Sequence, residues 1–160
     1  MTEHQTLNSF LAEQTDGGSL GAAVEAAVKA IANSCCAISE IIALGPLAGS
    51  LGETDGQNAD GDFQAELDLR ANEIVIDELK DSPVAYLASE ELELPVPINE
   101  DAPLYVAIDP LDGSSNIDTN VSVGTIFSVM PMRCDKGDLA SDCFLQQGIH
   151  QLAAGYVIYG

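Results

Sequence analysis

Two aspartates stand three residues apart at the end of an apolar run. Asp109 and Asp112 enclose a Pro-Leu pair, and Gly113 follows them. Pro110 stiffens the turn and Gly113 allows close backbone approach, so both carboxylates can face one point with a backbone carbonyl between them. Carboxylate and carbonyl oxygens suit Mg²⁺ or Mn²⁺. The spacing therefore indicates a divalent metal site, while an acidic β-turn with no ligand stays open as the alternative.

The residues after the second aspartate suit a phosphate. The backbone N–H groups of Gly113, Ser114 and Ser115, with the two hydroxyls, form a set of donors that can hold one. A phosphate beside a metal predicts metal-assisted hydrolysis of a phosphate ester. Two or more Mg²⁺ ions would polarise the phosphoryl oxygen, stabilise the leaving alkoxide and lower the pKa of the attacking water. A carboxylate would orient that water as general base.

A second acid pair follows another apolar run. Glu90 and Glu91 come directly after Ser89, at the end of the run from Val84 to Ala88. Two strands that end in carboxylates can bring them together if the strands are neighbours, and sequential elements often are. Taken alone, an exposed loop pair is the simpler interpretation.

A third acid cluster lies in and after a Gly- and Asp-rich stretch. It contains Asp60, Asp62, Glu66 and Asp68. An EF-hand is excluded because Leu67 stands where the bidentate Glu should be. Asp62 and Asp68 are six residues apart, so they do not share a helix face. They can share a metal site only if the loop folds over it.

Composition and charge exclude several classes of protein. The chain has 160 residues, a formal net charge of −21 and five Lys plus Arg. Binding to phosphate backbones or to anionic membranes needs clustered cations, so neither partner is expected. No apolar run reaches a membrane span and no signal peptide is visible, which predicts a cytoplasmic protein. Cys35 and Cys36 are expected to be reduced, and no disulfide framework is expected.

The elements that must position these acids follow from periodicity. Residues 1–18 read as a mobile N-terminal arm, and a helix begins near Ser19 and ends near Gly45. Residues 45–62 read as a loop and 63–80 as a second helix. Strands are expected at 84–88, 104–108, 121–130 and 153–159, the third with Val123, Thr125, Phe127 and Val129 on one face. The pattern predicts an α+β fold with helices on one face of a sheet.

The central motif resembles a known family. The run Asp109-Pro110-Leu111-Asp112-Gly113-Ser114 resembles the signature of the Mg²⁺-dependent, lithium-sensitive sugar and inositol phosphatases. Further matches make it similar to class I fructose-1,6-bisphosphatase from about Ala22 to Gly160. They are Ser115-Asn116-Ile117-Asp118, residues 122–127, Gly61-Asp62, Leu67-Asp68, Ser89-Glu90-Glu91, Ala153-Ala154-Gly155-Tyr156 and Tyr159-Gly160.

The resemblance implies a role for each acidic cluster. Mg²⁺ is the implied cofactor, with Mn²⁺ or Zn²⁺ as alternatives and two or more ions per site. The metal ligands would be Glu90, Asp109, the Leu111 carbonyl, Asp112 and Asp62. Asp68 and Glu91 would activate water, and residues 112–115 (Asp112, Gly113, Ser114, Ser115) would contact the phosphate.

The resemblance also implies a reaction and a fold. Fructose 1,6-bisphosphate would be hydrolysed to fructose 6-phosphate and phosphate, in gluconeogenesis or the Calvin cycle. The fold would be a layered α/β sugar-phosphatase fold. This chain would be its N-terminal, metal-binding half (residues 19–160), with two long helices packed on a mostly antiparallel sheet. The family is usually homotetrameric, so self-association is expected.

The family's second half has no counterpart in this sequence. It would carry a further Glu metal ligand and the cationic residues that hold the sugar and the second phosphate. The chain is therefore expected to be inactive or nearly so by itself. Three alternatives stay open: a sedoheptulose-bisphosphatase, an inositol-phosphatase-like enzyme, or a non-catalytic metal-binding or regulatory module. The turns that bind AMP in some relatives are not matched.

Overall fold

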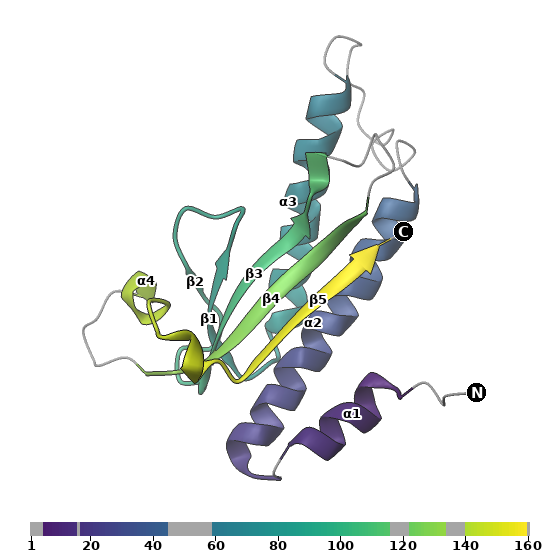
Figure 1. Cartoon of the computed structure of the whole chain (residues 1–160). Helices are drawn as coiled ribbons and strands as arrows, with labels where there is room; N and C mark the ends of the chain where they lie inside the picture. The colour runs from purple at the N-terminus through teal and green to yellow at the C-terminus, as the bar shows by residue number, and fades with distance from the viewer. Residues whose placement is uncertain (1–4, 16, 45–58, 116–121, 134–139, 160) are drawn as a thin grey trace.

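The computed structural model describes residues 5–15, 17–44, 59–115, 122–133 and 140–159, and only the backbone of 59–64, 140 and 141. The expected loop therefore lies outside the described residues from 45 to 58, as does the matched stretch Asn116-Ile117-Asp118. The described part forms three helices packed on one face of a sheet, with a short fourth helix on the other side (Figure 1).

Helix α1 (Leu7–Gln14) lies within the segment that was expected to be a mobile arm. Thr6 caps it, because its side chain accepts a hydrogen bond of 3.2 Å from the Ser9 N–H. Leu11 is buried, and with Leu7 and Phe10 it lines a 220 Å³ cavity against α2 and β5. The expectation of an arm was wrong for these residues, because apolar side chains at i, i+3 and i+4 follow a cap and give the helix a face to bury.

Helix α2 (Ser19–Leu44) has the predicted bounds and packs on α3 (Ala59–Leu79). By length and composition α2 is apolar enough to cross a membrane. It buries a stripe that includes Ala27, Ile31 and Ile38 inside the protein, which is the pattern of a core helix. Leu20 is 42% exposed because it lies in the first turn, before the buried positions begin.

Helix α3 begins at Ala59, four residues before the predicted start at Phe63. Asp60 and Asp62 therefore lie in the first turns of the helix. Acidic residues are favoured there because the N-terminal end of a helix carries a partial positive charge. Their side chains lie outside the described part of the structure.

The sheet has five strands in the order β2-β1-β3-β4-β5. The strands are β1 (Val84–Ser89), β2 (Val96–Pro97), β3 (Leu104–Asp112), β4 (Val123–Pro131) and β5 (Ala153–Tyr159). Only β1 and β3 run parallel, so the sheet is mixed and mostly antiparallel as expected. The two-residue β2 was not predicted, because so short a strand has no periodicity to detect.

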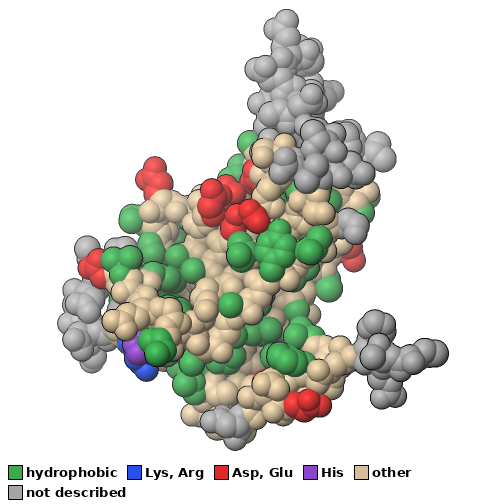
Figure 2. All heavy atoms as spheres, in the orientation of Figure 1, with side chains coloured by type: hydrophobic (Ala, Val, Ile, Leu, Met, Phe, Trp, Pro, Cys, Tyr) green, Lys and Arg blue, Asp and Glu red, His purple; other side chains and the backbone are tan. Residues whose placement is uncertain are grey.

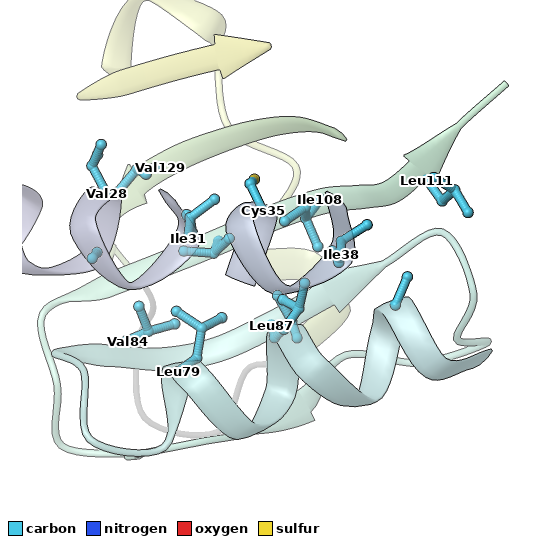
Figure 3. Close-up of a cluster of buried hydrophobic side chains, with 14 of the residues drawn as sticks. Val28, Ile31, Cys35, Ile38, Leu79, Val84, Leu87, Ile108, Leu111 and Val129 are labelled. Carbon is cyan, nitrogen blue, oxygen red and sulfur yellow. The ribbon is translucent and has the colours of Figure 1, made fainter. Parts of the chain in front are cut away.

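The main core lies between the helices and the sheet. Figure 3 shows side chains of α2 and α3 meeting those of β1, β3 and β4, with Ile31, Ile38, Leu87 and Val129 among the buried ones. The expected alternation along β4 is confirmed, because its odd-numbered residues from Val123 to Val129 face this core. The helices thus cover one face of the sheet (Figure 1).

The opposite face of the sheet is only partly covered. Tyr105 and Met130 form a small second core there with Cys143 of the short helix α4 (Ala140–Cys143). The 3-10 helix η3 (Gly148–His150) follows along the chain. Ile126 and Ile158 remain 48% and 65% exposed on the rest of that face. A shallow hollow of about 710 Å³ crosses it, lined by residues of β1, β3, β4 and β5.

The cysteines divide into two kinds. Cys35 is free and buried, and Cys36 is free and exposed, which confirms that both are reduced. Cys143 is disulfide-bonded, so the expectation of no disulfide was wrong there. Disulfide pairing depends on the distance and orientation of two cysteines in the fold, which sequence spacing alone does not give.

Candidate active site

The acids of β1 and β3 meet because these two strands are parallel neighbours. Ser89 is in register with Ile108, and the Glu90 N–H donates a hydrogen bond of 3.0 Å to the Ile108 carbonyl. Glu90, Glu91 and Asp109 therefore lie at the same end of the sheet, toward the carboxyl ends of β1 and β3. The sequence predicted that these acids could meet if their two strands were neighbours, and the structure confirms that the strands are neighbours.

The signature residues belong to the strand rather than to a turn after it. β3 continues through Asp112, four residues beyond the predicted end at Ile108. Asp109 pairs with Ile126 and Asp112 with Gly124, so β3 holds one extra residue between them, as in a β-bulge. The irregular pairing there tolerates a proline, which cannot donate to the ladder. The strand ends where Gly113 adopts a φ of +80°, a conformation that favours glycine.

Two buried hydroxyls hold the bulge in place. The Thr125 hydroxyl donates a hydrogen bond of 2.8 Å to the Pro110 carbonyl and shares one of 2.5 Å with the Tyr159 hydroxyl. Because the Thr125 proton goes to the carbonyl, Tyr159 is the donor in that second bond. Burial raises the pKa of Tyr159, which keeps its proton in place. This chain of hydrogen bonds ties the signature to β4 and β5.

Asp68 joins the site from α3. The Ser114 hydroxyl donates a hydrogen bond of 3.2 Å to Asp68 Oδ2, while Asp68 Oδ1 is buried with no hydrogen-bond partner. Burial raises the pKa of Asp68, the Ser114 hydrogen bond opposes that shift, and the charge of Glu90 adds to it. Asp68 therefore has an acceptor oxygen available to a cation or a water.

The five carboxylates repel one another. Burial, a hydrogen bond with Glu90 and the charges of Asp68, Glu90 and Asp109 raise the pKa of Glu91 to about 7. Burial and the charges of Glu90, Asp112 and Asp68 raise the pKa of Asp109, against the opposing effect of a backbone hydrogen bond. Every neighbouring charge that shifts these two groups is negative, so a bound cation would relieve the repulsion.

Figure 2 shows acidic side chains gathered at one end of the open sheet face, beside hydrophobic ones. Among the side chains that the structure describes, no three acidic, His or Cys groups already surround a single point as a formed metal site. The donors nonetheless fit a hard divalent cation. They are all oxygens, and one buried oxygen of Asp68 has no hydrogen-bond partner.

Most of the expected site residues lie together. Glu90, Glu91, Asp109 and Asp112 are at the ends of β1 and β3, Asp68 faces them from α3, and the Leu111 N–H donates to Asp109 Oδ1 at 3.0 Å. Gly113, Ser114 and Ser115 follow β3 directly. Asp62 is placed only as a backbone position in the first turns of α3, and Glu66 faces Arg70 at 4.0 Å on that helix.

Sequence reasoning missed one side chain at this site. The Tyr156 hydroxyl donates a hydrogen bond of 3.2 Å to Asp112 Oδ2 from the edge strand β5. Partial desolvation and this contact raise the pKa of Tyr156, so the hydroxyl stays protonated and remains a donor. The alternation of β5 indicates that Tyr156 shares a face with Ile158, but no pattern in the sequence pairs it with Asp112.

The comparisons with known proteins agree with this geometry. Residues 5–160 match the sequence profile described as "Fructose-1-6-bisphosphatase, N-terminal domain". The chain belongs to the fructose-1,6-bisphosphatase family. The resemblance seen in the signature residues is therefore confirmed, and so is the α+β fold.

Individual members of the fructose-1,6-bisphosphatase family match over most of the chain. A class 1 fructose-1,6-bisphosphatase of Nitrobacter hamburgensis is 50% identical over 161 residues, covering all of this chain and 45% of that protein. One from Xanthobacter autotrophicus is 53% identical over 138 residues, covering 86% and 37%. The crystal structure of Leishmania major fructose-1,6-bisphosphatase in holo form has a TM-score of 0.77 at 32% identity, covering 98% and 49%. The chain spans about half the length of the relatives it matches.

Proposed function

We propose that this chain is the metal-binding and phosphate-holding half of an enzyme that hydrolyses the 1-phosphate of fructose 1,6-bisphosphate. One observation carries the proposal: acids from β1, β3 and α3 meet at one sheet edge, beside the Gly113–Ser115 donors. Family membership supplies the substrate class.

The residues of the proposed site have different roles. Glu90, Asp109, the Leu111 carbonyl, Asp112 and Asp62 would hold Mg²⁺ or another hard divalent ion. When bound, the ion supplies the positive charge that stabilises the phosphoryl group and the leaving alkoxide. The other groups of the chain handle water and phosphate.

The proposed reaction is the hydrolysis of a phosphate ester. Asp68 and Glu91 would orient a water and accept its proton, as general bases do. The water oxygen forms a bond to phosphorus, the bond from phosphorus to the sugar oxygen breaks, and the sugar oxygen takes up the proton that the carboxylate releases. The N–H groups of residues 113–115 and the serine hydroxyls would hold the phosphate. The Ser114 hydroxyl has one proton and donates it to Asp68 in this structure, so it would turn from Asp68 to the phosphate when substrate binds.

The test joins the chain to the part of the Nitrobacter hamburgensis relative that follows its matched region. We expect the chain alone to give little or no turnover and the joined protein to release phosphate from fructose 1,6-bisphosphate with Mg²⁺. Sedoheptulose 1,7-bisphosphate and inositol monophosphate are assayed in parallel. A folded joined protein that binds Mn²⁺ but turns over neither sugar bisphosphate would overturn the enzyme proposal and favour a binding module. Preference for inositol phosphate would move the chain to the related enzyme class.

We propose Mg²⁺ as the cofactor, with Mn²⁺ or Zn²⁺ as alternatives, and two or more ions per site. The oxygen donors favour a hard cation.

A homotetramer in the cytoplasm, serving gluconeogenesis or the Calvin cycle, is the setting that family membership supports. Disulfides are rare in a reducing cytoplasm, so the redox state of Cys143 tests this setting. Trapping thiols at the moment of cell lysis, followed by mass spectrometry, decides whether Cys143 is oxidised in the cell.

A further inference from the structure

Each of three acids at the site is held by its own hydrogen-bond donor. Asp109 accepts from the Leu111 N–H at 3.0 Å and Asp68 from the Ser114 hydroxyl at 3.2 Å. Asp112 accepts from the Tyr156 hydroxyl at 3.2 Å, and among the described residues no other donor to its side chain is seen. The Tyr156 contact differs from the other two because it comes from the edge strand, two strands away from β3.

Gly124 makes the reach from Tyr156 to Asp112 possible. On β4, Gly124 is paired with Asp112 on one side and with Ile158 on the other. Tyr156 is therefore a diagonal neighbour of Gly124, and aromatic side chains can span that offset. A Cβ on Gly124 would lie 2.7 Å from both Cζ and the hydroxyl oxygen of Tyr156. The tyrosine ring thus occupies the space that the missing side chain leaves open.

We propose that Tyr156 is a positioning residue that holds the Asp112 carboxylate in the orientation in which it serves the metal site. The inference rests on the proposed function for the role of Asp112. Hydrogen bonds to metal-ligating carboxylates orient them, and loss of such a partner typically weakens metal binding or activity 10- to 100-fold. Tyr156 also lines the open hollow together with Glu90 and Asp109, so its hydroxyl lies on the side where the acids gather.

The alternative is that Tyr156 only covers apolar surface beside Ile126. Tyr156→Phe separates the two roles, because it removes the hydroxyl and keeps the ring. Tyr86→Phe is the matched control. Tyr86 is on β1, its ring packs against Tyr105 with centroids 5.6 Å apart, and among the described residues its hydroxyl shows no hydrogen bond.

Two measurements on the 160-residue chain test the proposal. The first is NMR of the Asp112 side chain without metal, using the three-bond couplings that report its χ1 rotamer. We expect one rotamer in the wild type and in Tyr86→Phe, and averaging over rotamers in Tyr156→Phe. The second is a calorimetric titration with Mn²⁺, where we expect Tyr156→Phe to bind about tenfold more weakly and Tyr86→Phe to bind as the wild type does.

The outcomes separate this inference from the proposed function. Unchanged Asp112 couplings in Tyr156→Phe would overturn the positioning role, whatever the titration gives. Changed couplings with unchanged Mn²⁺ affinity would show that Tyr156 orients Asp112 without serving the metal, which also overturns it. If the wild type binds no Mn²⁺, the metal site of the proposed function fails in this chain, and the role in metal binding fails with it. The couplings then still report whether Tyr156 holds the carboxylate.

Discussion

At the scale of single residues, Asp112 combines three structural features of the candidate site. It ends β3, its charge raises the pKa of Asp109, and it accepts the Tyr156 hydrogen bond. In the protein joined to a relative's second half, we expect Asp112→Asn to lower kcat by more than about 100-fold, which exceeds the usual loss from an outer partner. A phosphate-release assay measures it. Asp81→Asn, an exposed position before β1 and far from Glu90, should leave kcat unchanged.

Thr125 stabilises the backbone at Pro110, within the signature of β3, through a hydrogen bond from its hydroxyl. Thr125→Val leaves the buried Pro110 carbonyl without its donor and removes the hydrogen bond between Thr125 and the Tyr159 hydroxyl. Unsatisfied buried polar groups cost about 1–3 kcal/mol each, so we expect the free energy of unfolding to fall by about that amount or more. Urea denaturation of the chain gives the value. Thr125→Ser keeps the hydroxyl, and if it loses as much stability as Thr125→Val, the hydrogen bonds are not the cause.

At the scale of the elements, the pairing of β4 with β5 depends on a glycine. A Cβ at Gly124 would lie 2.2 Å from the Val157 carbonyl, so the edge strand must shift. We expect Gly124→Ala to destabilise the chain by about 1–3 kcal/mol, the usual cost of overpacking. Gly148→Ala is the control because a Cβ there meets nothing within 4 Å. Equal denaturation midpoints for the two variants would contradict the close approach of β5.

The elements also show which sequence signals were sufficient. The bounds of α2 were predicted correctly because a three-four apolar spacing ends at a Gly-Pro pair. The end of β3 was predicted wrongly because Pro110 normally interrupts a strand. The partner strand β4 extends the pairing past it through a bulge, and that partner is remote in sequence. The α1 helix was missed because eight residues carry little periodicity.

At the scale of the whole molecule, the charge of −21 and the gathered acids lead us to expect that divalent ions stabilise the fold. At a concentration of Mg²⁺ or Mn²⁺ about 100 times its Kd, binding adds about 2.7 kcal/mol of stability. For a chain of this size we expect Tm to rise by about 5–10 °C. Differential scanning calorimetry measures the shift, with NaCl of the same ionic strength as the control because any salt screens a net charge. An equal rise in NaCl would show general screening rather than a site.

The open sheet face predicts self-association of the isolated chain. Ile126 and Ile158 lie on that face, and Ile149 beside it is 84% exposed. Exposed apolar surface of this kind favours association. We expect a molar mass above 16.7 kDa in light scattering coupled to size-exclusion chromatography. Ile158→Lys should shift the equilibrium toward monomer. A wild type that stays monomeric at high micromolar concentration would contradict the expectation.

The sequence by itself determined which side chains and backbone donors are available to the candidate site. The acids, the Gly-Ser donors after them and the α+β layering are local properties, because residue type and spacing along the chain carry them. Only the tertiary structure decided how these parts meet. The parallel pairing of β1 with β3 brings Glu90 to Asp109, and the Ser114 hydroxyl after β3 donates to Asp68 on α3. A tyrosine on the edge strand reaches Asp112 across a glycine. Such contacts depend on strand order and register, which are set by long-range packing and not by any local pattern.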